Sequence, residues 1–284
     1  MRITLLGTGG PRPDPARQGP ATMVEVAGLH LLFDAGRGVA TQLARAGVSL
    51  DEIDAVFLTH HHFDHIGGLG DLLMAAWNLG RTRALNVYGP PGTCSIVGTL
   101  FSHIYAADIR FRIREAEVTG ARIPHPADAF RGFDVESGVV ESNPKLKLEV
   151  GRVEHGSIAL GLDAGDWSAV GYRIEGDNRT AVIAGDAVAG RDLGHLAGDV
   201  DALVICAYLA GDEIVSDEDR FLSEHILADA PQAAQIASEA GARQLILTHL
   251  RQKPSDSLEA MAREVRRIYS GDLVIGQDLL EIEI

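Results

Sequence analysis

The chain contains very little cysteine and few aromatic residues. Only two of its 284 residues are cysteines, Cys94 and Cys206, and neither belongs to a CxxC pair. This usage excludes a disulfide framework and is typical of a reducing compartment, so a cytoplasmic protein is expected. Aromatic residues make up 5% of the chain, whereas aliphatic residues are abundant, which is typical of an α/β protein with a sizeable core.

Positive charge is also scarce. The chain has 25 Lys and Arg against 40 Asp and Glu, a formal net charge of −15. This balance argues against a broad nucleic-acid surface and against attachment to an anionic membrane. A bound metal ion could still create a local positive site.

Long apolar runs and linkers are absent as well. No stretch reaches the roughly 18–20 apolar residues needed to cross a bilayer. The apolar part of residues 1–7 is too short for a signal peptide. No segment rich in Pro, Gly and Ser divides the chain, so residues 1–284 are expected to form a single domain.

What the chain does have is the segment HHHFDH, residues 60–65, directly after an apolar run that predicts a buried strand. His60 and His62 are two positions apart, so in extended backbone their side chains point the same way. A bend in the chain would then present Asp64 and His65. Imidazole and carboxylate without thiolate suit zinc, iron or manganese. A solvated polar loop is the alternative, but four histidines and an aspartate in six residues favour a metal site.

Strand signals and helix signals alternate along most of the chain. Helices are predicted over residues 39–46, 69–79, 93–103, 231–240 and 257–269. Residues 106–144 have scattered prolines and no sustained period, and they are predicted as irregular strands and loops. The acidic residues 211–223 are predicted as a loop. Strand-rich blocks followed by helices in both halves indicate an α/β (α+β) fold, a four-layer αββα sandwich of two mixed sheets with outer helices.

Three more metal-capable side chains, His155, Asp186 and His249, each stand directly after a predicted strand. Taken singly, a histidine at such a place is usually hydrogen-bonded or at the surface, and Asp186 would be a turn residue. Strands of one sheet align their ends, however, so these side chains and the HHHFDH segment can meet in space.

This set of motifs resembles the metallo-β-lactamase superfamily, particularly its ribonuclease Z and arylsulfatase-like branch. The family's HxHxDH motif matches HHHFDH, and its later ligands match the segments VEHG, IAGD and LTHL. The opening LLGTGGPRPDPARQGPATMVEV and the segment FDAGRG also resemble the start of the family, so the match covers nearly the whole chain.

The resemblance implies the metallo-β-lactamase fold and a dinuclear site for two Zn²⁺, with Mn²⁺ or iron as alternatives. By this resemblance His60, His62 and His155 would bind one ion, Asp64, His65 and His249 would bind the second, and Asp186 would bridge them. The implied activity is arylsulfatase-like hydrolysis of a small-molecule ester by attack of a metal-bridging hydroxide. A phosphodiesterase acting on a small or cyclic phosphodiester and a lactonase are alternatives. Iron-dependent oxygen or sulfur chemistry is an alternative of a different class.

The candidate catalytic residues are Asp64 and His225. His225 opens a segment that resembles the family's block before its last histidine, and it would stabilise the transition state or protonate the leaving group. A surface histidine at the start of a helix is the alternative for His225. His61 is expected to point away from the ligands, and no role is assigned to His103, His125 and His195.

The resemblance to ribonuclease Z has two departures. Those enzymes carry a protruding Gly/Pro-rich arm that grips tRNA, whereas the thirty residues between His155 and Asp186 predict only a loop and a hairpin. Arg37, in FDAGRG, stands where ribonuclease Z proteins have an acidic residue. Together with the acidic net charge, these departures argue against tRNA processing and against nucleic acid as a partner. A homodimer is compatible with the resemblance.

Overall fold

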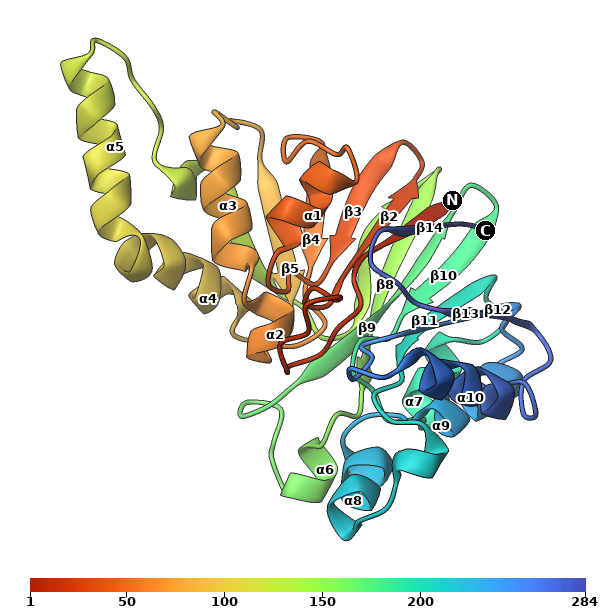
Figure 1. The fold of residues 1–284 in the computed structure, drawn as a ribbon. Coiled ribbons are helices and arrows are strands. Elements are labelled where there is room, and N and C mark those ends of the chain that lie inside the picture. Colours follow the sequence, from red (N-terminus) through yellow and green to blue (C-terminus); the bar gives the residue numbers. More distant parts are fainter.

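The computed structural model describes residues 1–284, the side chain of Ser142 excepted, and consists mainly of two seven-stranded mixed sheets packed face to face (Figure 1). The first sheet has the order β14-β1-β2-β3-β4-β5-β6, and the second β13-β12-β11-β10-β9-β8-β7. The first sheet comprises β1 (Arg2–Gly7), β2 (Ala21–Val26), β3 (Leu29–Phe33), β4 (Ile53–Phe57), β5 (Leu85–Gly89), β6 (Phe130–Asp134) and β14 (Leu280–Glu283). The second comprises β7 (Gly138–Asn143), β8 (Leu146–Val153), β9 (Ala169–Gly176), β10 (Arg179–Ile183), β11 (Ala202–Cys206), β12 (Gln244–Thr248) and β13 (Asp272–Ile275).

Helices form the outer layers and the connections at one edge. They are α1 (Val39–Arg45), α2 (Phe63–Ile66), α3 (Leu69–Asn78), α4 (Thr93–Thr99), the π-helix η1 (Leu100–Ile104), α5 (Ala106–Val118), the 3₁₀ turns η2 (Pro126–Asp128) and η3 (Gly211–Glu213), α6 (Ser157–Leu160), α7 (Arg191–Leu196), α8 (Asp217–His225), α9 (Ala230–Glu239) and α10 (Ser255–Val265). None of the described helices is both long enough and apolar enough to span a membrane.

Three apolar clusters hold these layers together. The middle cluster lies between the sheets and contains Phe33, Phe57 and Tyr172, whose rings pack with centroids 5.1–5.5 Å apart. A second cluster joins the first sheet to α1 and α3, and a third joins the other sheet to α7, α9 and α10. Each sheet therefore buries both faces, which requires helices outside as well as a partner sheet inside. The expected αββα sandwich is confirmed.

Strand direction brings particular loops to one edge of the sandwich. In the first sheet β3, β4, β5 and β6 run parallel, and in the second β10, β11, β12 and β13 run parallel. Because β8 and β10 are both antiparallel to β9, β8 runs in the direction of β10. The carboxyl ends of β8, β10 and β12 therefore meet at one edge, where ligand sites form in such sheets.

The structure corrects two predictions of local structure. Residues 106–118, predicted as irregular, form the thirteen-residue helix α5, which projects beyond α3 and away from the sheets (Figure 1). Residues 217–225, most of which fell in the predicted acidic loop, form α8. Ser216 starts α8 through a capping box in which its side chain and that of Asp219 bond each other's main-chain N–H.

Candidate metal centre

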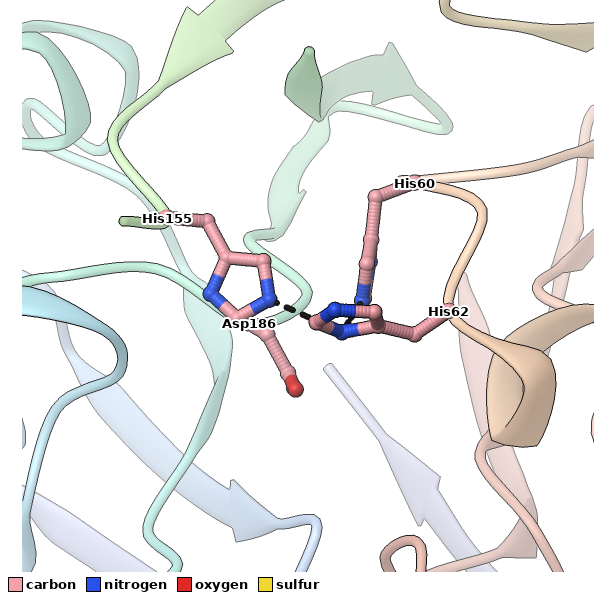
Figure 2. A group of neighbouring side chains, drawn as sticks. All are labelled: His60, His62, His155 and Asp186. Atoms are coloured by element: carbon pink, nitrogen blue, oxygen red, sulfur yellow. Dashed lines mark hydrogen bonds between the residues drawn. The ribbon is translucent and has the colours of Figure 1, made fainter. Parts of the chain in front are cut away.

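Seven histidine and aspartate side chains converge at the edge where the strand ends meet. They fall into a first group, His60, His62, His155 and Asp186, and a second group, Asp64, His65 and His249. In each group one nitrogen or carboxylate oxygen per residue lies within 4.8 Å of the others. Figure 2 shows the first group: its side chains come from three separate loops and point toward one another. All seven metal ligands predicted from the sequence are thus brought together.

The three imidazoles of the first group face each other through ring nitrogens. Nδ1 of His62 lies 3.0 Å from Nε2 of His60 and 3.1 Å from Nε2 of His155 (Figure 2). His60 and His155 are buried, whereas His62 is exposed at the mouth of the site. This crowding of nitrogens is the arrangement expected when imidazoles share a cation.

Asp186 lies close to both groups. Its Oδ2 atom is 3.5 Å from Nε2 of His65 and 3.2 Å from Nε2 of His249, although Asp186 also belongs to the first group. Nε2 of His249 is in turn 3.2 Å from Oδ2 of Asp64. The carboxylate of Asp186 therefore sits where it could contact two ions.

For three of the five histidines, outer contacts fix which ring nitrogen faces the cluster. Nδ1 of His155 donates to the main-chain oxygen of Ile226 at 2.5 Å, and Nδ1 of His65 donates to Oδ2 of Asp34 at 2.8 Å. Nδ1 of His60 lies 3.0 Å from Oγ1 of Thr59. In each case Nε2 is left toward the cluster, which is how proteins orient histidine ligands and choose their tautomer.

The backbone at the site adopts conformations that few residues tolerate. Asp34 and His249 have φ of 60° and 53°, the left-handed region that non-glycine residues seldom occupy. Gly185, with φ of 63°, precedes Asp186, and a Cβ atom there would lie 2.7 Å from the side chain of Thr59. Such strain is found where the surrounding structure holds a functional geometry in place.

Burial and neighbouring charges move the pKa values of the ligands apart. Burial lowers the pKa of His60 well below its ordinary value, lowers that of His155, and takes the pKa of His62 to about 4. Burial would raise the pKa of Asp186, but His249 and His65 outweigh it and hold that pKa well below the usual range. At neutral pH His60, His62 and His155 are thus uncharged and Asp186 is ionised, the forms that bind metal. Burial would lower the pKa of His65, but Asp186 and Asp34 outweigh it and raise that pKa well above its ordinary value, so His65 must lose a proton to become a ligand.

The unpaired atoms of the cluster fit a metal site. Nε2 of His65, Oδ1 of Asp186 and Nδ1 of His249 are buried and have no hydrogen-bond partner among the described residues. Buried polar atoms are almost always paired, so the unpaired Nε2 of His65 and Oδ1 of Asp186 within one cluster fit a site for a cation. Donor atoms of nitrogen and oxygen suit zinc, manganese or iron and do not choose among them.

The other histidines lie outside the cluster. His225 ends α8, with its side chain 45% exposed and packed beside Phe221. It is therefore at the end of a helix, not at its start, and no described hydrogen bond joins it to a ligand. His61 points away from the ligands, with Nε2 2.8 Å from Oγ1 of Thr93. His103 and His195 are exposed, and His125 accepts a hydrogen bond at the start of η2.

Sequence reasoning missed three residues that contact the ligands. Asp34 follows β3 in the FDAGRG segment, and its position after a strand was the available signal. Trp167 packs on His62, and Tyr208 packs on His249. A single aromatic residue in a loop gives no spacing pattern, so neither ring was predictable.

The chain is similar to known proteins over its full length. A family model described as "Beta-lactamase superfamily domain" matches residues 30–250. The ribonuclease Z of Mycolicibacterium gilvum is 33% identical over 293 residues, covering 100% of this chain and 96% of that protein. Bacillus subtilis YhfI, a metallo-β-lactamase fold protein, covers 99% of this chain and 98% of its own, with a TM-score of 0.72 and 20% identity. The similarity to human tRNase Z, short form, covers 100% of this chain and 99% of that protein, with a TM-score of 0.70 and 22% identity.

These relatives correct the expected partners. The expectation of a small-molecule substrate and no nucleic acid is wrong, because full-length relatives at 33% identity are named ribonuclease Z. They give no support to the arylsulfatase-like activity and favour the phosphodiesterase alternative. Net charge misled the prediction because it sums over the whole surface and ignores where the charges lie. By its family match and its end-to-end similarity to ribonuclease Z, the chain belongs to the metallo-β-lactamase superfamily, in the ribonuclease Z branch.

Proposed function

We propose that this protein is a zinc-dependent phosphodiesterase that cleaves RNA, with transfer RNA as the substrate class. The observation that carries the proposal is the combination of a complete seven-residue ligand cluster with end-to-end similarity to proteins named ribonuclease Z. The printed name of the human structural neighbour, tRNase Z, supports the choice of transfer RNA.

In this proposal His60, His62 and His155 would hold one ion, Asp64, His65 and His249 would hold the other, and Asp186 would contact both. Asp186 belongs to the first group and its Oδ2 lies beside His65 and His249 of the second, which supports this double role. When bound, two divalent ions supply Lewis-acid activation of water and neutralise charge that develops on a phosphodiester. Asp34, Thr59 and the carbonyl of Ile226 hold the ligands in the correct orientation.

The projecting segment, which is α5 with the residues that follow it (residues 106–125), supports RNA as the substrate. It has four arginines, Arg110, Arg112, Arg114 and Arg122, against three acidic residues, in a chain whose net charge is −15. Arg110 and Arg122 are exposed and make no ion pair with another described residue. Phe111, next to Arg110 on α5, has a side chain that is 67% exposed. Exposed arginines with an aromatic side chain among them form a surface suited to a phosphate backbone and unstacked bases.

No arm was expected between His155 and Asp186, and that interval contains only α6, β9 and the strand β10. The projecting segment occurs earlier in the chain, between His65 and His155 (Figure 1). It is helical and not rich in Gly and Pro. The chain therefore lacks a Gly/Pro-rich arm between His155 and Asp186, but it has a projection at another place in the sequence, and that projection is helical.

The test is cleavage of a labelled transfer RNA transcript that carries extra nucleotides at both ends. The wild type with Zn²⁺ should cut the transcript at a defined position, and the metal-free wild type and His62→Ala should not. Elemental analysis of protein purified without added metal should give about two zinc ions per chain. An aryl sulfate, a lactone and bis(p-nitrophenyl) phosphate complete the panel.

The panel separates the parts of the proposal. Hydrolysis of bis(p-nitrophenyl) phosphate with an intact transcript would reject RNA as the substrate and keep the phosphodiesterase. Cleavage of the transcript by His62→Ala would reject the metal mechanism. Iron in place of zinc would overturn the assigned metal.

A further inference from the structure

Trp167 lies against the first ligand group and not the second. Its ring centroid is 4.5 Å from that of His62, and 5.8 Å from those of His60 and His155. Its Nε1–H also donates to the main-chain oxygen of His155 at 2.9 Å. The aromatic neighbour of the second group is a different residue, Tyr208, with its ring 5.8 Å from that of His249. Each group therefore has an aromatic neighbour of its own.

His62 has a particular need for such a neighbour. His60, His155 and His65 each have a second ring nitrogen held by Thr59, Ile226 or Asp34. Among the hydrogen bonds of the described residues, none reaches Nε2 of His62. Its ring is exposed and is tilted 38° to the indole of Trp167 at the shortest ring distance that Trp167 makes to a histidine. Packing against Trp167 thus takes the place that an outer hydrogen bond has at His60, His155 and His65.

The chain around Trp167 is itself held in place. The main-chain N–H of Trp167 donates to the oxygen of Asp163, whose side chain accepts from Gly165 and Asp166. Three residues later, the N–H of Val170 donates to the oxygen of Thr59, next to His60. The indole also borders a cavity of about 260 Å³ that Val153 and Leu162 line. Trp167 therefore contacts both this cavity and the ligand cluster.

We propose that Trp167 is a positioning residue for the first group, which sets the zinc affinity of that group and leaves the second group unaffected. The proposal rests on the metal-binding half of the proposed function and is independent of the substrate. Trp167 acts in two ways: its ring orients His62, and its N–H fixes the main chain of His155. Outer partners of this kind change metal affinity by about 10–100-fold when they are removed.

The test is calorimetric titration of the metal-free protein with Zn²⁺. Trp167→Ala should weaken one of two equivalents by about tenfold or more and leave the other unchanged. Trp167→Phe, which keeps a ring beside His62 and loses the donated hydrogen bond, should weaken the same equivalent by less. Trp77→Phe is the matched control, because it removes a hydrogen bond from an indole to a main-chain oxygen, that of Pro124, outside the site.

Two ligand variants show which of the two bound zinc ions is weakened. In His249→Ala, which disables the second group, Trp167→Ala should weaken the zinc that remains. In His60→Ala, which disables the first, it should have no effect. The metal-free Trp167 variants should unfold near the temperature of the wild type, and excess Zn²⁺ should restore two bound ions.

The contrary outcomes are distinct. Equal weakening in both backgrounds, or weakening in neither, would overturn the role of Trp167 while the wild type still binds two zinc ions. A wild type that binds no zinc would instead refute the proposed function. If Trp167→Ala does not fold, Trp167→Phe in the same two backgrounds decides the question.

Discussion

The hydrogen bond between His155 and the carbonyl of Ile226 links the ligand cluster to the end of α8. His225 is the residue directly before Ile226, so this link holds His225 at the rim of the site although its side chain contacts no ligand. The position is compatible with a group that meets the substrate from the solvent side.

We predict that His225→Ala lowers kcat on RNA by roughly 10²–10⁴-fold, the usual range for loss of a general acid, with zinc content unchanged. The loss should be smaller on bis(p-nitrophenyl) phosphate, because its leaving group needs little protonation. Steady-state kinetics on both substrates, with zinc content measured on the same samples, provides the check. His195→Ala, at an exposed histidine of α7, is the matched control. Equal turnover by His225→Ala and wild type would assign His225 to the surface.

Among single residues, the sequence predicted the candidate metal ligands better than the residues that hold those ligands in place. His60, His62 and His249 stand at strand ends in a recognisable motif order, so residue type and position identified them. Asp34 and Trp167 act through hydrogen bonds and ring packing across the fold. Such contacts depend on how loops close in three dimensions, and spacing along the chain does not encode them.

Among the elements, α5 was the hardest to predict and is the most informative about the substrate. Its sequence alternates apolar and basic residues over Ile109 to Arg114, which mimics the two-residue period of a strand. Only Ile109 and Ala116 of this helix are buried, so the helical apolar stripe is too narrow to show. For α8, by contrast, the signal was present, since Ser216 is followed three residues later by Asp219.

We predict that replacing Arg110 and Arg122 with Gln weakens RNA binding and lowers its dependence on salt. Each phosphate contact that is lost should reduce the slope of log K against log salt by about 0.7–0.9. Hydrolysis of bis(p-nitrophenyl) phosphate should be unchanged, since α5 projects away from α2, the helix that carries Asp64 and His65 (Figure 1). Fluorescence anisotropy of a labelled transcript over a range of salt concentrations measures the slope.

A control for total charge is Arg179→Gln, because Arg179 starts β10, at the edge of the second sheet opposite the ligands. This variant should bind RNA as the wild type does. If the variant with Gln at Arg110 and Arg122 and the Arg179→Gln variant lose affinity for RNA equally, the loss comes from net charge and not from the projecting segment.

In the molecule as a whole, the layered architecture followed from pattern because it depends on many residues at once. Strand-rich blocks with apolar runs in both halves require two sheets, and both faces of each sheet must be covered. The nature of the substrate did not follow from bulk charge. A net charge of −15 describes the average surface, whereas the proposed recognition of RNA depends on the site and on one projecting helix.

The last prediction concerns the stability of the whole fold. The ligands join loops from both sheets, so bound metal connects the two halves of the sandwich and binds only the folded chain. A ligand of this kind at 100 times its Kd stabilises the folded state by about 2.7 kcal/mol. In a chain of this size that corresponds to a rise in Tm of roughly 5 °C or more. Removing metal with a chelator should therefore lower Tm by this amount, and Zn²⁺ should restore it. Calorimetric scans of the metal-free and zinc-loaded protein measure the shift.

His60→Ala should respond less than the wild type to either treatment, because its first group is incomplete. An identical Tm with and without zinc in the wild type would show that the cluster does not hold a metal that connects the sheets.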